Sequence, residues 1–102
     1  MLTNEMVLKI FEDYLEEDQA IEVVQTRHGC AVMLWDTAKQ DWSDVKCCPT
    51  PEKLFDALLE AVVEYQEYLV LRKGDADTLD ETNRQRIERL RQRYLHRRET
   101  IL

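Results

Sequence analysis

The chain of 102 residues contains only two glycines and two prolines. Disordered linkers and low-complexity segments are usually rich in such residues, so their scarcity argues against both. Two glycines also leave no glycine-rich loop of the kind that holds phosphates in nucleotide-binding proteins. We therefore expect a folded domain with one core, because a chain of this length seldom divides into two.

Long hydrophobic runs are missing too, and the first residues carry no basic cluster. A membrane-spanning helix needs about 20 mostly apolar residues, and a secretory signal begins with a basic segment, so we expect neither. The three cysteines are an odd number, which is typical of reduced thiols rather than of a disulfide framework. These features together predict a cytoplasmic protein.

Charge is abundant but unevenly distributed. The formal net charge is −7, and hydrophobic residues make up 44% of the chain, enough for a compact core. Residues 1–68 contain fifteen acidic and five basic side chains, whereas residues 69–102 contain nine basic and six acidic ones. An acidic body attracts an arginine-rich end, either its own or that of a neighbouring molecule.

Two helices are indicated by capping residues followed by apolar residues at three- and four-residue spacing. The first begins at Thr3 or Asn4 and ends at the acidic run 16–18, where the helix dipole disfavours negative charge. The second begins at Thr50, which a proline follows, and ends at Gly74. Its exposed side is predicted to be acidic and consists of Glu52, Asp56, Glu60, Glu64 and Glu67.

Three segments between these helices have strand character: residues 20–27, 30–36 and 41–48. The short connections "HG" and "TAKQ" predict two hairpins. A two-residue turn at His28-Gly29 pairs Gln25 with Val32 and Val23 with Leu34. The second hairpin places Cys30 opposite Cys47, Val32 opposite Val45, and Trp35 opposite Trp42.

Cross-strand partners share a face of a sheet, so this register assigns every strand residue to one side. One face is almost entirely apolar and consists of Ile21, Val23, Cys30, Val32, Leu34, Val45 and Cys47. The other is mixed and consists of Glu22, Val24, Thr26, Met33, Trp35, Trp42, Asp44 and Lys46. We expect an α+β fold, a three-stranded antiparallel meander with helices packed on one face, in the order α-β-β-β-α-α.

A third helix is predicted at residues 80–99, with Thr78 or Asp80 as its cap. Its narrow apolar stripe consists of Leu79, Ile87, Leu90, Tyr94 and Ile101. Seven arginines border this stripe: Arg84, Arg86, Arg89, Arg91, Arg93, Arg97 and Arg98. Such a helix packs on an apolar groove beside acidic groups, in its own chain or in a second subunit. We therefore divide the chain into a core domain, residues 1–74, and an arginine-rich C-terminal helix, residues 75–102.

The cysteines raise the question of a metal or thiol site. In the predicted register His28, Cys30, Cys47 and Cys48 lie at one corner of the sheet, and zinc prefers such ligands. However, adjacent strand residues point to opposite faces, and paired C-x₂-C spacing is missing. We favour small buried thiols, and we predict no catalytic residue, no metal and no cofactor.

Nucleic acid is one candidate partner, because an arginine-rich helix can follow the groove of a duplex. The order of one helix, three strands and one helix is similar to that of the double-stranded RNA-binding domain. The resemblance would place His28 in a loop that contacts RNA. Where that family has a cluster of lysines, this chain reads "TPEKLFD", with one lysine beside two acids, so we do not assign it to the family.

Protein binding is the function that the sequence favours. We predict a small non-catalytic cytoplasmic module that self-associates, as a homodimer, through its C-terminal helix. The candidate interaction residues are Trp35, Trp42, Ile87, Leu90, Arg93, Tyr94 and Arg97. A nucleic-acid-associated regulator is the alternative, and a zinc or thiol site at the cysteine corner is the third reading.

Overall fold

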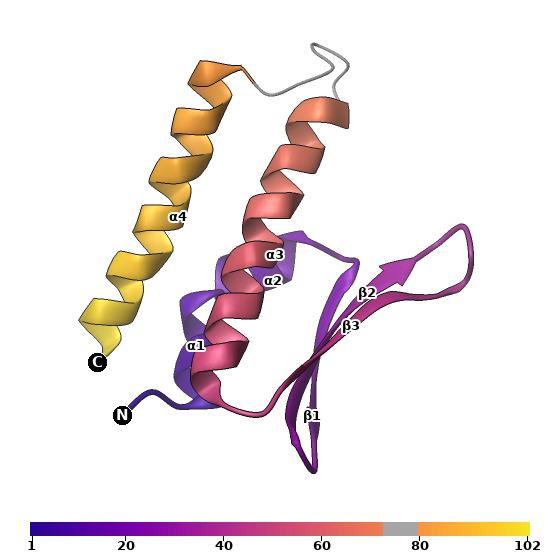
Figure 1. Cartoon of the computed structure of the whole chain (residues 1–102), viewed down its shortest axis with the longest axis vertical. Helices are drawn as coiled ribbons and strands as arrows, with labels where there is room; N and C mark the ends of the chain where they lie inside the picture. Colours follow the sequence, from indigo (N-terminus) through magenta and orange to yellow (C-terminus); the bar gives the residue numbers. More distant parts are fainter. Residues whose placement is uncertain (73–79) are drawn as a thin grey trace. The chain divides into compact units, whose positions relative to one another are not determined.

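A computed structural model describes residues 1–72 and 80–102 of the chain. The secondary structure elements are α1 (Asn4–Ile10), α2 (Glu12–Glu17), β1 (Ile21–Thr26), β2 (Gly29–Asp36), β3 (Asp41–Cys48), α3 (Pro51–Arg72) and α4 (Glu81–Ile101) (Figure 1). The three strands form one antiparallel sheet in the order β1-β2-β3, which confirms the predicted α+β fold and meander. Two compact units are present, Met1–Leu58 and Leu59–Leu102, and α3 contributes to both.

The first predicted helix is interrupted at Phe11. Thr3 caps α1 as expected, since its hydroxyl accepts a hydrogen bond from the Met6 amide at 3.1 Å. At Phe11 the backbone leaves helical geometry, with φ −100° and ψ 15°, and α2 begins one residue later. The Phe11 ring is fully buried and its centroid lies 5.3 Å from that of Phe55, so core packing holds the residue at the break. The prediction of one continuous helix was wrong.

Asp18, which follows α2, is buried although it is charged. One carboxylate oxygen accepts a hydrogen bond from the Tyr14 hydroxyl at 2.8 Å, and the other accepts the Ala20 amide at 3.1 Å. These bonds compensate for the loss of hydration and direct the chain from the helix into β1. The sequence indicated only that the helix ends in an acidic run.

The β1–β2 register differs from the prediction by two residues. The turn consists of residues 27–28, so that Val23 lies opposite Val32 and Ile21 opposite Leu34. A shift of two residues preserves the side of each side chain, and therefore the face assignment of both strands holds. Gly29 follows the turn with φ +115°, and a Cβ atom on it would meet the carbonyl oxygen of Cys48 and lie 2.7 Å from the Pro49 Cα.

The β2–β3 register contains a β-bulge, which the regular prediction did not include. Trp35 lies opposite Trp42 as expected, but the register shifts between Leu34 and Trp35, and Ser43 is the extra residue on β3. Beyond the bulge, Cys30 lies opposite Cys48 rather than Cys47, and Val32 opposite Lys46 rather than Val45. The predicted positions of Val45 and Cys47 on the core side of the sheet were therefore wrong.

The helix α3 begins as predicted, because the Thr50 hydroxyl accepts the Lys53 amide at 3.2 Å and Pro51 is the first helical residue. Leu54, Phe55 and Leu58 are buried, and the acidic side chains of the opposite face are exposed, except Glu67, which is half-buried. The predicted helix end at Gly74 lies outside the described residues. Buried side chains of the first unit include Val7, Ile10, Phe11, Tyr14, Ile21, Cys30, Val32, Cys48, Leu54, Phe55 and Leu58.

The second unit contains the end of α3 and the whole of α4. Asp80 caps α4, since its carboxylate accepts the Asn83 amide at 2.8 Å. The other predicted cap, Thr78, and the stripe residue Leu79 lie outside the described residues. A hydrogen bond of 3.4 Å joins the Arg86 guanidinium to the Gln66 side chain of α3. Within the described parts of the chain, neither long helix has an apolar stretch sufficient to cross a bilayer.

Candidate protein-binding face

The β-bulge at Ser43 turns the mixed face of the sheet into an apolar one. Beyond the bulge Val45 lies opposite Met33 and Cys47 lies opposite Ala31, so both β3 side chains share the face of the tryptophan pair. We call this side of the sheet the outer face. Its apolar members are Val24, Ala31, Met33, Trp35, Trp42, Val45 and Cys47, and its polar members are Glu22 and Thr26.

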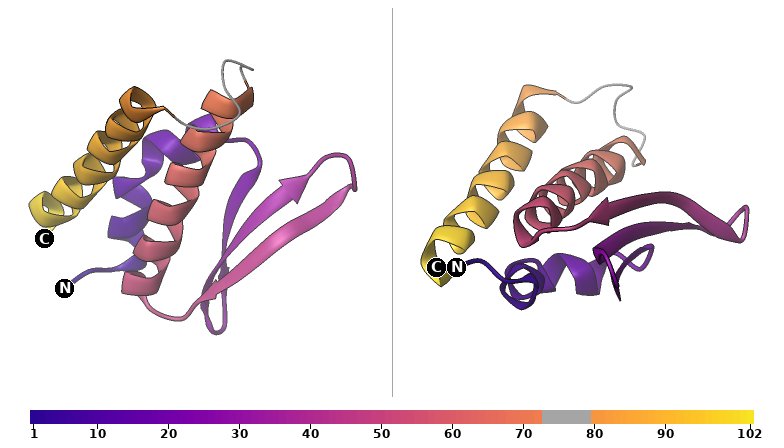
Figure 2. Two further views of the ribbon diagram at one scale, coloured as in Figure 1. Left: turned by 45° about the horizontal axis from the view of Figure 1, so that its top comes forward. Right: turned by 60° about the horizontal axis from the view of Figure 1, so that its bottom comes forward.

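Trp35 and Trp42 form the aromatic part of the outer face. Their ring centroids lie 5.0 Å apart and the ring planes meet at 76°, an edge-to-face arrangement. Such pairs contribute roughly 0.5–1.5 kcal/mol beyond their burial, and they hold both rings in fixed positions. The two residues are half-buried and lie beside the β2–β3 turn, which extends away from α1 and α2 of the same unit (Figure 2).

Solvent reaches most of the outer face. Val45 is 57% exposed and Val24 is 38% exposed, while Ala31 and Met33 are half-buried. Among the outer-face residues of the three strands, Glu22 is the one charged side chain, because the bulge moves Asp44 and Lys46 to the opposite side. A contiguous apolar surface of this kind on a small folded unit is typical of a protein-binding site.

The opposite side of the sheet contributes to the core. Ile21, Cys30 and Val32 are buried, as the apolar pattern predicted. Asp44 and Lys46 lie on this side at the edge of the sheet, where Asp44 is exposed and Lys46 is half-buried. Lys46 thus occupies the position opposite Val32 that the sequence assigned to Val45, and Cys48 occupies the position opposite Cys30 that it assigned to Cys47.

The cysteine corner does not form as the sequence suggested. Cys30 and Cys48 are buried opposite one another, but Cys47 is exposed on the outer face and His28 is exposed in the β1–β2 turn. No cluster of three or more histidine, cysteine or acidic side chains suited to a metal ion occurs in the described residues. The adjacent cysteines are therefore divided between the two sides of the sheet, which is the expected alternation in a strand.

The electrostatics of this corner favour a neutral Cys48 thiol. Burial raises the pKa of the Cys48 thiol, and the neighbouring Cys30 and Cys47 raise it further. The Cys48 thiol donates a hydrogen bond to the Lys46 carbonyl at 3.7 Å. A nucleophilic cysteine requires the opposite change, a lowered pKa next to a base or a cation.

The predicted interaction residues of α4 have different environments. Ile87 is 6% exposed and Tyr94 is 2% exposed in the single chain, whereas Leu90 is half-buried and Arg93 is exposed. The guanidinium of Arg97 lies 4.7 Å from the centre of the Tyr94 ring, a cation–π contact. Two of the residues proposed as a seam between subunits are thus already buried within one molecule.

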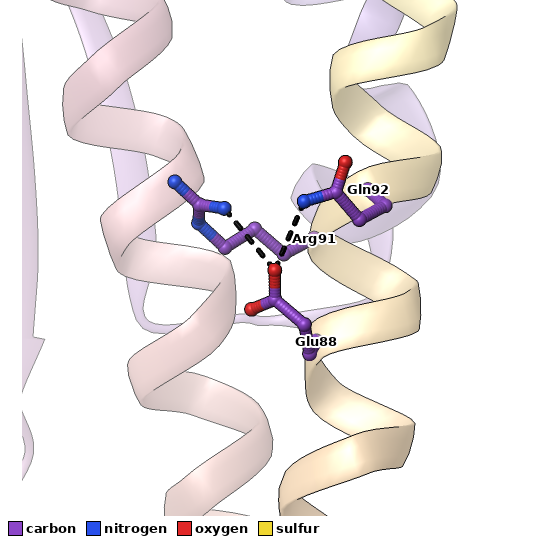
Figure 3. Close-up of polar contacts among 3 residues, drawn as sticks. All are labelled: Glu88, Arg91 and Gln92. Carbon is purple, nitrogen blue, oxygen red and sulfur yellow. Dashed lines mark hydrogen bonds and ion pairs between the residues drawn. The ribbon is translucent and has the colours of Figure 1, made fainter.

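The solvent-facing side of α4 is occupied by polar contacts along the helix. Glu88 accepts hydrogen bonds from Gln92 at 2.9 Å and from Arg91 at 3.4 Å, the latter also an ion pair (Figure 3). One turn earlier, Gln85 donates to Glu81 at 3.2 Å. Exposed pairs of this spacing contribute a few tenths of a kcal/mol each, and they suit a surface that remains hydrated.

Comparison with known proteins adds no further assignment. No family model matches the chain, and neither does a curated protein or a solved structure.

The sequence placed Val24 and Met33 on the same face as the tryptophan pair, but only the tryptophans were predicted as interaction residues. It assigned Val45 and Cys47 to the opposite face, and that assignment was wrong. A signal for the bulge was present, because the apolar residues Trp42 and Val45 are three positions apart in a strand whose regular period is two.

Proposed function

We propose that the chain is a small non-catalytic protein-interaction module of the cytoplasm and that the outer face is its binding surface. The observation that supports this proposal is the open apolar side of the sheet, on which Val45 is 57% exposed. Binding a protein would remove this surface from water, a gain of about 25 cal/mol for each Å² of apolar area.

The composition of the outer face favours a protein over other partners. Tryptophan and methionine are enriched at the centres of protein interfaces, where charged residues are depleted. The outer face has both residue types and one carboxylate, Glu22, but no basic residue that would hold a phosphate. We therefore expect a partner with an uncharged apolar surface.

The absence of catalysis is part of the proposal. The raised pKa of the Cys48 thiol argues against this one residue as a nucleophile, because it disfavours the thiolate. The odd number of cysteines is typical of reduced thiols, which supports the proposed cytoplasmic location.

Association through the C-terminal helix remains a prediction. Because Ile87 and Tyr94 are buried in the single chain, a dimer that used them would have to replace their present packing. The nucleic-acid alternative also remains a prediction, for which Arg84, Arg86 and Arg89 offer exposed positive charges.

Photo-crosslinking in cells tests the proposal. A benzophenone amino acid is introduced at Val45, on the outer face, or at Asp44, the next residue on the same strand. Both positions are exposed, so the second is a control for accessibility. We expect discrete protein adducts from position 45 and not from position 44. Identical adducts from both positions, or none from position 45, would contradict the proposal.

A purified partner identified in this way allows a quantitative test. The substitution Val45→Glu adds a charge to the outer face, whereas Thr37→Glu adds the same charge at an exposed position in the β2–β3 turn. We expect Val45→Glu to weaken binding about tenfold or more, the effect of removing an interface residue that contributes over roughly 1.4 kcal/mol. Thr37→Glu should leave the affinity unchanged.

A further inference from the structure

The sheet has two edge strands, and they differ in how well they are protected against pairing. The order β1-β2-β3 leaves β1 and β3 each with one neighbour in the described part of the chain. The β3 edge contains a bulge at Ser43 and two charges, Asp44 and Lys46, on the core side of the sheet. Bulges and inward-pointing charges are the features by which proteins prevent edge-to-edge association.

The β1 edge has none of these features. Its pairing with β2 is continuous from Ile21 to Thr26, and the strand contains no proline, lysine or arginine. Four of its six residues are exposed: Glu22, Val24, Gln25 and Thr26. An unprotected edge of this length is a template for another strand.

The backbone groups that β1 presents follow from its ladder with β2. The Trp35 amide donates to the Ala20 carbonyl at 2.8 Å, so this pair is hydrogen-bonded. Hydrogen-bonded and non-hydrogen-bonded pairs alternate in an antiparallel ladder. Glu22, Val24 and Thr26 therefore bond to β2, while the N–H and C=O groups of Ile21, Val23 and Gln25 point away from it.

We infer that β1 pairs antiparallel with β1 of a second copy of this chain, centred on Val23. In this register Val23 lies opposite Val23 of the second copy, and Ile21 lies opposite Gln25 on either side. All three outward-facing residues then form hydrogen-bonded pairs. On the outer face Glu22 lies opposite Val24, so no like charges meet.

Neighbouring registers are less favourable. If the centre of the pairing moves from Val23 to Glu22, the two Glu22 carboxylates lie opposite one another, and like charges in that position are destabilising. A shift in the other direction places Ile21 opposite Arg27 in the turn, and one of the hydrogen-bonded pairs is lost. The strand is thus complementary to itself in one arrangement.

Pairing of this kind would enlarge the binding surface. One outer face has three strands, of which β2 has eight residues, and measures about 14 by 26 Å, or roughly 370 Å². This flat area is less than half of the roughly 800 Å² that each partner contributes to a standard interface. A six-stranded sheet joins two outer faces side by side. The dimer goes beyond the proposed function, and its formation does not depend on the outer-face partner.

Cysteine cross-linking tests the register directly. In a Cys47→Ser background, which removes the exposed thiol, the double variant Glu22→Cys, Val24→Cys places a cysteine opposite a cysteine of the second copy at two points. Under mild oxidation we expect a disulfide-linked dimer. Each single variant is the matched control, because its cysteines lie diagonally across the two strands at a Cα separation of about 8 Å, beyond the reach of a disulfide. Equal cross-linking of the singles and the double variant would overturn the register.

Light scattering on the purified wild-type chain, from micromolar to millimolar concentration, tests the dimer itself. A monomer mass throughout would overturn the inference. Gln25→Pro is the informative variant, because the Gln25 amide points away from β2 and its loss leaves the ladder within the chain intact. We expect it to be monomeric, with an unchanged circular dichroism spectrum. A dimer that persists in Gln25→Pro would refute pairing through β1, whereas Val45→Glu should remain dimeric and lose only the outer-face partner.

Discussion

Two valines that the regular register placed opposite one another provide a sharp test of the bulge. Val32 is 5% exposed in the core, whereas Val45 is 57% exposed on the outer face. Replacing either by alanine removes the equivalent of two methylene groups. A regular ladder would make the two substitutions similarly costly, since both side chains would then be buried.

The structure predicts different costs. At Val32, about 0.8 kcal/mol for each buried methylene plus a cavity term gives a loss of roughly 2–3 kcal/mol in the free energy of unfolding. At Val45 more than half of the side chain is already hydrated. What remains is partial burial and the lower strand propensity of alanine, together below about 1 kcal/mol.

Urea unfolding followed by circular dichroism measures both values. The two variants and the wild type are compared at one protein concentration, because an association equilibrium makes apparent stability depend on concentration. An unchanged slope of free energy against urea shows that the same transition is observed. Equal losses, or a larger loss for Val45→Ala, would refute the bulge and with it the apolar outer face.

Four further predictions concern the turn, the thiols and the arginine helix. Gly29→Ala should destabilise the fold by more than about 1 kcal/mol, because φ +115° disfavours a side chain and the added Cβ meets Cys48 and Pro49. Thermal unfolding measures this loss, and an unchanged midpoint would contradict the prediction. Cys47 should react with a thiol reagent much faster than Cys30 and Cys48 in the folded chain, as mass spectrometry of labelled peptides would report, and equal rates would disprove the assigned burial. Burial raises the pKa of the Cys48 thiol in the folded chain. The contribution of this thiol to the free energy of unfolding is therefore complete below its ordinary pKa and falls as the pH rises above it, because the unfolded chain ionises first. Cys48→Ala should reduce this decline. We expect that the chain does not shift the electrophoretic mobility of duplex DNA or RNA at physiological salt. The nucleic-acid alternative would instead be supported by binding that weakens steeply with salt and is lost when four arginines become glutamine: Arg84, Arg86, Arg89 and Arg93.

The elements of the fold could be predicted because local signals determine them. Thr3, Thr50 and Asp80 each accept the amide three residues later, as capping residues do, and the tryptophan pair marks the second hairpin. The strand pairing in the first hairpin differs from the prediction by two residues, but the period of a strand is two, so no side chain changed sides.

The interruption at Phe11 and the bond network of Asp18 could not be predicted. Phe11 satisfies a helical pattern, and its departure depends on contact with Phe55, which is distant in sequence. Asp18 continues an acidic run, and only the nearby Tyr14 hydroxyl and the turn into β1 make its burial favourable. The chain path brings Phe55 close to Phe11, whereas the partners of Asp18 are only four and two residues away in the sequence.

The amino-acid sequence by itself determined the α+β class, the meander, the helix starts and the arginine-rich composition of α4, because these follow from capping residues, periodicity and charge within short segments. The tertiary structure decided which side of the sheet is open and which residues occupy it. One extra residue, Ser43, exchanges the faces of the rest of β3, and whether a strand accommodates a bulge depends on the fit of β2 and the core rather than on β3 alone. For that reason Val45 and Cys47 lie in solvent and the two edges of the sheet differ.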